Sequence, residues 1–593
     1  RVRLTRLLAG SEGTLALFVE AKLAIRDAPR FRSVALLSFA SLEALGEAVE
    51  RALGFGPSGV EMIDRTLLEE LRRLEHPAVG FLPSEVEAAL IVEFDGDDEE
   101  EVRSLTRRLV ERLLREEGLA VEGHFAFDPK EQERLLAVRK ASVPILYRAS
   151  GRRKPLSFVE DGTVAPEHLP AYLRGLRQIL GKHGVHAAII GHAGNGNLHV
   201  RPFLDLQDPE DLRKVEAIAE EVAALLKTLG GSLSGEHGDG LVRTPLLPKM
   251  FGDLYPLLGA IKRLFDPKGL LNPGKIVLHP EAPLRITEFL RYGAEYRRVP
   301  TGTPFDEPLW AEEIEKCHGC GTCRDYCPVF LATGDEAATA RAKANLLRAV
   351  IRGDLPPSIL LSEEFKAVMD LCVNCRLCLT ECPTQVNIPD LCIQARGYYV
   401  THRGQTLQNR LLAEAQWTSR LGSLAAPWAN SANRFIPLRR LVEKGIGLDH
   451  RRCLPLFQRP AFLTYSSPDG WLARHRVLYF PGCFASFSDP QGEAWATVEV
   501  LERNGCFVLT PPGLRCCGVA KVTVGSLEEA RDDAERNVRI LSPWLEEGFL
   551  IVASAASCGL ALKQDYPHLL GTPEARQVAE NTWDVHEFLL MLK

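Results

Sequence analysis

The chain has 593 residues, a formal net charge of −7 at pH 7, 46% hydrophobic residues and 25% charged residues. A chain of this length and composition can form three or four globular domains, each with its own core. Acidic and basic residues are interspersed, which argues against nucleic acid as a partner. The sequence lacks both an apolar stretch of about 18 residues and a cationic-then-apolar leader. These features predict a cytoplasmic protein with no transmembrane segment, and they leave open peripheral binding at the inner face of the cell membrane.

Two kinds of hydrophobic pattern alternate along the first 130 residues: strands at 33–39, 58–63, 88–96 and 120–127, and amphipathic helices at 41–53 and 97–118. Strands have a period of two residues and helices a period of 3.6. This order predicts a split β-α-β, ferredoxin-like domain in which a layer of helices packs on an antiparallel sheet.

The rest of the chain changes character several times. Residues 185–280 predict a hairpin around 191–200, a helix at 208–229, a glycine-rich turn and a final helix that closes at FDPKGLLNPGKI. The polar, proline-bearing stretch 281–310 is predicted to be a linker. The remaining parts are then a cysteine-rich, helical module at 311–395, a helical connector at 396–475 and an α/β domain at 476–593 that opens on the strand HRVLYF. The predicted fold class is α+β with several domains.

Two cysteine runs, CHGCGTCRDYCP at 317–328 and CVNCRLCLTECP at 372–383, both have the spacing C-x2-C-x2-C-x3-C-P. Bacterial ferredoxins with two clusters have this spacing, and the fourth cysteine of each run binds the other cluster. We therefore predict two [4Fe-4S] clusters, one bound by Cys317, Cys320, Cys323 and Cys382, the other by Cys372, Cys375, Cys378 and Cys327. The alternative is a pair of zinc sites or a disulfide knot. Zinc sites usually need only two CxxC units, however, whereas each of these runs has four cysteines.

Four further cysteines are Cys483, the adjacent pair Cys516 and Cys517, and Cys558. Their motifs resemble the CCG cysteine-rich domain of heterodisulfide reductases and of glycolate oxidase iron–sulfur subunits. The resemblance implies a further iron–sulfur centre or a place where electrons leave. The family pattern ends in CxxC, and Ala555 occupies its first position, so a structural role is the alternative. Cys392, Cys453 and Cys506 are predicted to be small buried apolar residues.

Two histidines, His192 and His199, flank the loop GHAGNGNLHV, and Glu236 and His237 lie in the glycine-rich turn SGEHGDG. Two His and one Glu suit Zn²⁺, or a similar divalent ion such as Mn²⁺ or Fe²⁺, with a coordination position open for substrate. His237 is then free to act as a base. The alternative for the histidine pair is a purely structural loop.

Six motifs in order resemble the carboxy-terminal half of the FAD-linked 2-hydroxyacid dehydrogenases of the vanillyl-alcohol oxidase type. They are AGSEGTLALFVEAKLAI at 9–25, AVRK at 137–140, KPLSFVED at 154–161, GHAGNGNLHV at 191–200, SGEHGDGLVRT at 234–244 and FDPKGLLNPGKI at 265–276. The resemblance makes residues 1–27 the end of an FAD-binding domain and residues 28–280 the substrate and metal domain. With the cysteine modules behind it, the chain resembles the fused FAD and iron–sulfur D-lactate or D-2-hydroxyglutarate dehydrogenases.

The resemblance implies oxidation of a D-2-hydroxy acid to the 2-oxo acid, with electrons passing from FAD through the clusters to a quinone, cytochrome or similar acceptor. His192, His199 and Glu236 would hold the divalent metal, and His237 would take the substrate hydroxyl proton. Arg139 and Lys154 would bind carboxylate oxygens, with surface ion pairs as the alternative. The flavin-proximal positions would be Gly10, Ser11, Gly13, Thr14 and Asn272.

The sequence also departs from the family. Asn195 stands where many relatives have Asp, and Leu136 where many have Trp. The glycine-rich pyrophosphate-binding region that family members have before GSEGTL does not occur in the sequence, and whether the chain holds FAD by itself stays open. Two other functions stay open: a glycolate oxidase-like electron-transfer component dependent on a separate flavin-binding chain, and a heterodisulfide reductase-like thiol chemistry that Ala555 disfavours. A homo-oligomer also stays open.

Overall fold

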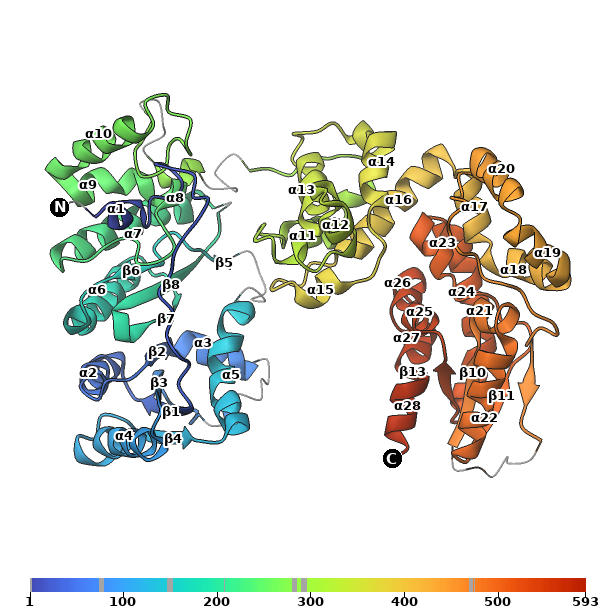
Figure 1. Cartoon of the computed structure of the whole chain (residues 1–593), viewed down its shortest axis with the longest axis horizontal. Helices are drawn as coiled ribbons and strands as arrows, with labels where there is room; N and C mark the ends of the chain where they lie inside the picture. Colours follow the sequence, from blue (N-terminus) through green and yellow to red (C-terminus); the bar gives the residue numbers. More distant parts are fainter. Residues whose placement is uncertain are drawn as a thin grey trace. The chain divides into compact units, whose positions relative to one another are not determined.

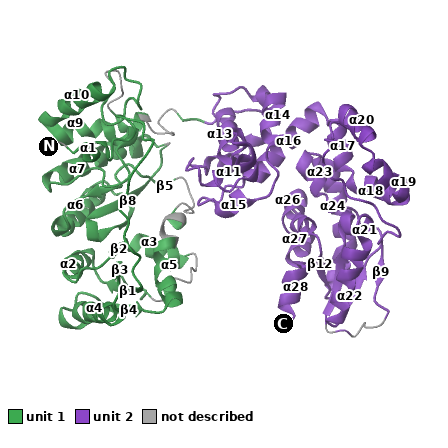
Figure 2. Ribbon diagram, viewed as in Figure 1, with its two compact units in different colours: residues 1–297 green, residues 298–593 purple. Residues whose placement is uncertain are grey.

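The structure is a computed structural model that describes residues 3–73, 79–80, 82–146, 153–206, 208–279, 285–289, 296–468, 473 and 475–593. The chain divides into two compact units, residues 1–297 and 298–593 (Figure 2). None of the helices in these described stretches is both long and apolar enough to cross a bilayer.

An antiparallel sheet forms the centre of the first unit, with the strand order β4-β1-β3-β2-β7-β8-β5 and with β6 also paired to β8 (Figure 1). The strands are β1 (Phe31–Phe39), β2 (Gly59–Asp64), β3 (Ala88–Gly96), β4 (Glu122–Ala126), β5 (Lys154–Pro155), β6 (Gly162–Thr163), β7 (Ala187–Gly191) and β8 (Asn197–Leu204). The first four strands have the order 4-1-3-2 and are joined by helices after β1 and β3, which confirms the predicted ferredoxin-like arrangement.

Helices cover both faces of this sheet, whereas the sequence predicts one layer. Alternate residues of β1 serve the two faces: Ala35 and Leu37 pack in one apolar cluster, Val34 and Leu36 in the other. The first face is covered by α2 (Leu42–Leu53), α4 (Glu99–Glu111), α6 (Leu169–Lys182) and α7 (Pro209–Thr228), and the second by α3 (Arg65–Arg73) and α5 (Pro129–Leu146). Both faces of the sheet are therefore buried.

The acidic run DDEEE has a structural role at the start of α4. Asp98 caps this helix, because its side chain accepts hydrogen bonds from the N–H groups of Glu100 and Glu101. Acidic residues in a first turn also interact favourably with the helix dipole. The unit is completed by four shorter elements around the end of the sheet: α1 (Leu4–Leu8), α8 (Gly240–Arg243), α9 (Leu247–Phe251) and α10 (Tyr255–Phe265).

The second unit begins with helices and ends with a small parallel sheet. Its cysteine-rich part contains α11 (Pro308–Glu315), α12 (Pro328–Thr333), α13 (Ala340–Ile351), α14 (Glu363–Asp370), α15 (Leu377–Glu381) and α16 (Ile388–Arg403). Four connector helices follow: α17 (Leu407–Ala413), α18 (Ala415–Leu424), α19 (Ala426–Arg434) and α20 (Ile436–Ile446). The helical character predicted for both stretches is therefore confirmed.

The sheet of the second unit has the order β13-β12-β10-β11-β9. Its strands are β9 (Tyr465–Ser466), β10 (His475–Phe480), β11 (Cys506–Thr510), β12 (Leu550–Ala553) and β13 (Thr582–Asp584), and only the edge strand β9 is antiparallel. Helices α21 (Gly482–Phe487), α22 (Ala496–Arg503), α23 (Val519–Val524), α24 (Leu527–Glu546), α25 (Ala556–Leu560), α26 (Tyr566–Leu570), α27 (Pro573–Glu580) and α28 (Val585–Met591) complete it. The predicted strand HRVLYF is the central β10, and the α/β prediction is confirmed.

Candidate functional site

A hairpin of the first unit holds the two predicted metal-binding histidines. His192 follows the end of β7, and His199 lies within β8, where it pairs with Ile190 of β7. The turn between them requires glycine at Gly196, whose φ is +66° and where an added Cβ would lie 2.0 Å from the Val164 carbonyl oxygen. The glycine-rich loop therefore returns the chain tightly enough to bring both imidazoles to one place.

The buried carboxylate of Asp161 fixes the SGEHGDG turn. It accepts hydrogen bonds from the backbone N–H groups of residues 235–237 at 2.8 to 3.2 Å, from Ser234 Oγ at 2.8 Å and from Asn197 Nδ2 at 2.9 Å. Burial acts to raise the pKa of Asp161, but these hydrogen bonds outweigh burial and hold the pKa below its usual value. Asp161 thus stays ionised and sets the direction of the next side chains, Glu236 and His237.

Three imidazoles meet at one oxygen of Glu236. Its Oε1 lies 3.2 Å from Nε2 of His192, 3.3 Å from Nε2 of His199 and 3.2 Å from Nε2 of His237. Burial lowers the pKa of His199, which favours the neutral imidazole that metals bind. The predicted ligands His192, His199 and Glu236 are therefore brought together, and this set of nitrogen and oxygen donors fits a divalent ion.

Glu61, on β2, connects this group to Arg139. Its Oε1 lies 2.5 Å from Nδ1 of His192, and its Oε2 accepts a hydrogen bond from Nε of Arg139 at 2.8 Å. A carboxylate on the second nitrogen of a metal-binding histidine fixes the ring and its tautomer. The predicted substrate-binding role of Arg139 stays a prediction, as does that of Lys154, whose backbone pairs with Leu204 in the sheet.

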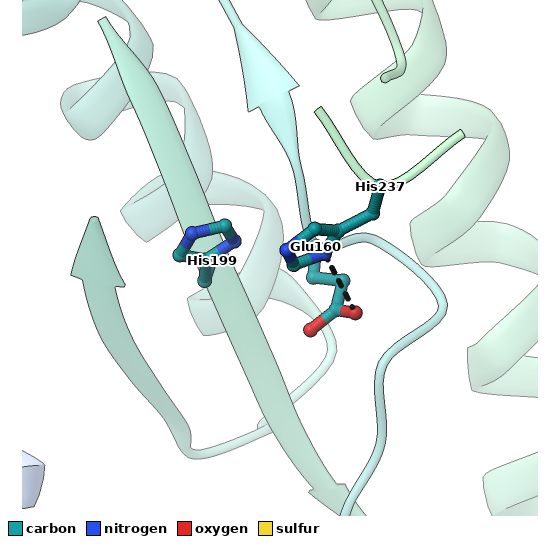
Figure 3. A group of neighbouring side chains, drawn as sticks. All are labelled: Glu160, His199 and His237. Carbon is teal, nitrogen blue, oxygen red and sulfur yellow. Dashed lines mark ion pairs between the residues drawn. The ribbon is translucent and has the colours of Figure 1, made fainter. Parts of the chain in front are cut away.

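Glu160 approaches Nδ1 of His237 (Figure 3). Its Oε1 lies 3.4 Å from Nδ1 of His237, and its Oε2 pairs with Nη2 of Arg201 at 2.8 Å. Glu160, His237 and His199 thus form a second group of candidate ligands that shares His199 with the first. A carboxylate that accepts from Nδ1–H leaves the lone pair on Nε2. His237 is therefore oriented to accept a proton at Nε2.

The predicted flavin-proximal residues 10–14 form one tight turn. Gly10 and Gly13 have φ values of +75° and +68°, and Oγ1 of Thr14 donates to the carbonyl of Ser11 at 2.6 Å. Ser11 is buried, and its Oγ finds no hydrogen-bond partner within the described part of the chain. A buried hydroxyl of this kind fits a turn that completes its hydrogen bonds with a bound ligand.

This turn is bound to the loop that carries His237. The Glu12 carboxylate accepts hydrogen bonds from the backbone N–H groups of Asp239 at 2.7 Å and Gly240 at 2.8 Å. Asn272, also predicted to be near the flavin, donates from Nδ2 to the Glu12 carbonyl at 2.6 Å. The flavin-proximal turn, Asn272 and the glycine-rich loop are therefore held as one assembly.

The eight cysteines of the two ferredoxin runs line two cavities of the second unit. Cys317, Cys320, Cys323 and Cys382 line the first, and Cys327, Cys372, Cys375 and Cys378 line the second, with Cys378 also at the edge of the first. The fourth cysteine of each run has crossed to the other group, as the spacing predicts. The donor sets therefore fit two [4Fe-4S] clusters.

Buried cations surround the second cavity. Lys343 is 1% exposed, lines this cavity and donates to the carbonyls of Ala337 and Ala338, while Arg396 donates to the Cys372 carbonyl at 3.2 Å. A hydrogen bond from the Cys392 thiol also lowers the pKa of Cys372. Cys392 is buried as predicted, but it contacts a cluster ligand. These groups favour the negative charge that a thiolate-bound cluster carries.

The four cysteines of the last domain also come together. Hydrogen bonds from Cys483 and Cys517 lower the pKa of Cys516 well below its usual value, and the thiol of Cys517 also contacts Cys558. Ala555 adds no sulfur but is the N-cap residue of α25, and its carbonyl accepts a hydrogen bond from the Cys558 N–H at 3.0 Å. Four adjacent thiols can bind a metal centre, although the CxxC pattern of the domain is incomplete.

The sequence analysis did not identify several residues of the site. Glu61 could have been found as the one acid in the predicted strand 58–63, and Glu160 and Asp161 end the quoted motif KPLSFVED without an assigned role. Asn195, which stands where many relatives have Asp, is exposed, and the buried amide that binds Asp161 is that of Asn197. The prediction for Cys453 was wrong, since this residue is exposed on a loop after α20.

Three family models match the chain. "FAD linked oxidases, C-terminal domain" matches residues 28–276, "4Fe-4S dicluster domain" residues 313–386 and "Cysteine-rich domain" residues 477–563. Residues 28–276 are thus similar to the C-terminal domain of the FAD-linked oxidases. His192, His199, Glu236 and His237 all lie within this matched stretch, and the eight cavity-lining cysteines lie within the stretch that matches the dicluster domain.

The curated relatives include dehydrogenases and an oxidase subunit. D-2-hydroxyglutarate dehydrogenase of Escherichia coli is 30% identical over 98% of this chain and 63% of its own length. The glycolate oxidase subunit GlcD of the same organism is 34% identical over 46% of this chain and 53% of its own length, and D-lactate dehydrogenase of Archaeoglobus fulgidus is 32% identical over 46% and 58%. The chain thus spans less than two thirds of the length of these relatives.

Proposed function

We propose that the chain belongs to an FAD- and iron–sulfur-dependent dehydrogenase that oxidises a D-2-hydroxy acid to the 2-oxo acid. The observation that carries the proposal is the meeting of three imidazole Nε2 atoms at Oε1 of Glu236, beside the turn that Glu12 holds. D-2-hydroxyglutarate is the first substrate to test, because the relative of that name aligns over nearly the whole chain.

In this proposal His192, His199 and Glu236 hold a divalent ion. Such an ion, when bound, polarises the substrate hydroxyl and lowers its pKa. Glu61 keeps His192 in the tautomer whose Nε2 can bind, since its carboxylate lies at Nδ1. The side chain of Glu236 is 46% exposed, so this group faces open space into which a small acid can enter.

His237 is the proposed base. It takes the substrate hydroxyl proton at Nε2, while Glu160 stabilises the imidazolium that forms through Nδ1 and Arg201 holds Glu160 in place. FAD, when bound near the turn of residues 10–14, supplies the acceptor for the C2 hydrogen and its two electrons. The step balances, because the hydroxyl proton goes to His237 and the C2 hydrogen would go to FAD with two electrons. The substrate thereby loses two hydrogen atoms and becomes the 2-oxo acid.

The clusters explain why an oxidase domain is fused to a dicluster domain. A [4Fe-4S] cluster supplies one-electron transfer, so two of them divide a two-electron oxidation into single steps toward an acceptor such as a quinone or a cytochrome. The four thiols of the last domain are the proposed further centre along this route.

The test is turnover of the FAD-supplemented, cluster-loaded chain on a panel of D- and L-2-hydroxy acids. We expect oxidation of D isomers, a fall on chelation of the divalent ion, and a loss of 10²-fold to 10⁴-fold in His237→Ala with the iron–sulfur absorbance unchanged. His183→Ala is the matched control, because His183 pairs with Glu221 on the helical surface of the same domain. A near-normal rate in His237→Ala contradicts the assigned base.

A second candidate is an electron-transfer component that receives its flavin from another chain. It is favoured by the extended segment after the flavin-proximal turn, whose apolar side chains are strongly exposed: Leu17, Val19, Leu23 and Ile25. Such a segment fits a packing surface for the remaining part of a flavin-binding domain. A flavin spectrum of the purified chain, before FAD is added, distinguishes the two candidates.

A further inference from the structure

The connector helices α17 to α20, residues Leu407–Ile446 (Figure 1), expose many large apolar side chains to solvent. On α18 the exposed positions are Trp417, Arg420, Leu421 and Leu424, a spacing of i, i+3, i+4 and i+7 that places them on one face of the helix. The other large apolar residues that these helices expose are Leu407, Leu411, Leu412, Trp428, Phe435, Ile436, Leu438 and Leu441. A helix at the surface of a globular protein normally buries its apolar face and exposes its polar face.

The inward faces of the same helices are polar and bonded. Gln416 accepts a hydrogen bond from the Cys516 N–H at 2.9 Å, and Ser423 donates to the Gln458 carbonyl at 2.6 Å. The guanidinium of Arg439 is buried and donates to the carbonyls of Asp449 and Arg452. The first contact joins α18 to Cys516 of the last domain, and the others join the connector helices to residues 449–458 of the loop that follows them, so the outward apolar face is part of the folded structure.

The charge of this segment differs from that of the whole chain. Residues 407–446 contain six basic and two acidic residues, a net charge of +4, whereas the chain as a whole has −7. Arg420, Arg434, Arg440 and Lys444 are exposed among the apolar side chains. Exposed tryptophan and leucine combined with lysine and arginine are what an interfacial helix needs on an anionic bilayer.

We propose that the connector helices dock the protein on the surface of a membrane that contains anionic lipid. Trp428, which is 82% exposed, and Leu441, which is 66% exposed, enter the boundary between headgroups and acyl chains, and the arginines remain among the lipid phosphates. A second copy of this chain is a poorer occupant, because two faces of the same positive charge repel each other.

The docked face also bears on electron transfer. Helix α18 presents Trp417 outward and bonds through Gln416 to the backbone of Cys516, one of the four clustered thiols. Docking therefore places this thiol group beside the lipid, which suits an electron acceptor that dissolves in the membrane. The docking itself does not rest on the proposed oxidation and is tested without substrate.

The test is co-sedimentation of the cluster-loaded full chain with vesicles of phosphatidylglycerol and phosphatidylcholine, and with vesicles of phosphatidylcholine alone. We expect binding to the first, little to the second, and release by salt. Trp428→Ser with Leu441→Ser lowers the partition coefficient by at least tenfold, and Arg434→Gln with Arg440→Gln lowers it by about 30-fold at low salt. All four positions are exposed, so folding is unaffected.

The matched control is Leu331→Ser with Leu590→Ser, two leucines that are each 67% exposed elsewhere in the second unit and should leave binding unchanged. Failure of the wild-type chain to bind either vesicle overturns the proposal, as does equal loss in the control. A concentration-dependent dimer that the Trp428 and Leu441 variant abolishes, without vesicle binding, overturns it in favour of a second copy. Loss of vesicle binding with unchanged oxidation of a soluble dye acceptor keeps this inference separate from the proposed function.

Discussion

Replacement of Glu160 by glutamine tests how His237 is prepared to act as a base. The side chain keeps its size but loses its charge, and its amide can donate to Nδ1 of His237, from which the carboxylate Oε1 now lies 3.4 Å. A ring that accepts at Nδ1 carries its proton on Nε2 and cannot take another there. The wild-type tautomer is therefore lost while the metal ligands His192, His199 and Glu236 are unchanged.

The structure limits the size of the effect. Loss of the correct tautomer in a buried acid–base pair costs up to about 10⁴-fold in rate. His237 is 41% exposed, so water can bind Nδ1 in place of the carboxylate and restore part of the population. We therefore expect a fall of about 10²-fold in kcat, which corresponds to about 3 kcal/mol, with little change in KM. Arg201 loses its charged partner, which is expected to lower stability by about 1–3 kcal/mol.

The assay is anaerobic single-turnover bleaching of the flavin after mixing with D-2-hydroxyglutarate, with metal content measured in the same samples. The matched control is Glu122→Gln, since Glu122 pairs with His124 at 2.9 Å elsewhere in the same domain. Unchanged bleaching in Glu160→Gln refutes the positioning of His237 by Glu160. Loss of the bound ion in this variant shows instead that Glu160 is itself a metal ligand.

Three further outcomes are expected. Asp161→Asn should accelerate amide hydrogen exchange at residues 235–237 by roughly 10-fold to 100-fold. The reason is that a hydrogen bond to a charged group is worth about 1.5–3 kcal/mol. Unchanged exchange means that another group fixes the turn. Burial raises the pKa of Asp64 from 3.8 to about 7, so the unfolded chain ionises first and the folded first unit loses about 3 kcal/mol of stability as pH rises from 4 to 7. Asp64→Asn should remove this pH dependence of urea unfolding, and an unchanged slope contradicts it. Cys382→Ala should lose about half of the cluster iron and keep one cluster signal in electron paramagnetic resonance, whereas loss of both signals or neither contradicts the crosswise ligand sets.

Local patterns explain which parts of the fold could be predicted. The short apolar run of β1 and the period of 3.6 in α4 are properties of short segments, so they can be recognised in the sequence. The second helical layer could not be predicted this way, because the burial of both faces of β1 leaves an apolar run without alternation. Helix α5 in particular has apolar residues without a clear stripe.

In the site, too, patterns within one segment could be predicted, whereas contacts between distant segments could not. The cysteine runs place their sulfurs by spacing along the chain, so their crosswise grouping follows from sequence alone. Glu61 lies 131 residues from His192, and the two meet because β2 pairs with β7 in a register that sets Met62 against Gly191. Its other partner, Arg139, lies 78 residues away on helix α5. No pattern within a segment specifies that register. The structure was therefore needed more to identify the residues that contact the ligands than to identify the ligands themselves.

The most direct test of the central claim is the content of divalent metal in the chain after the cluster iron has been accounted for. The account predicts one further ion per chain in the wild type and almost none in His192→Ala with His199→Ala, with oxidation of the D-2-hydroxy acid lost in parallel and both clusters retained. A full equivalent of the ion in that double variant, or normal oxidation without it, would contradict the account.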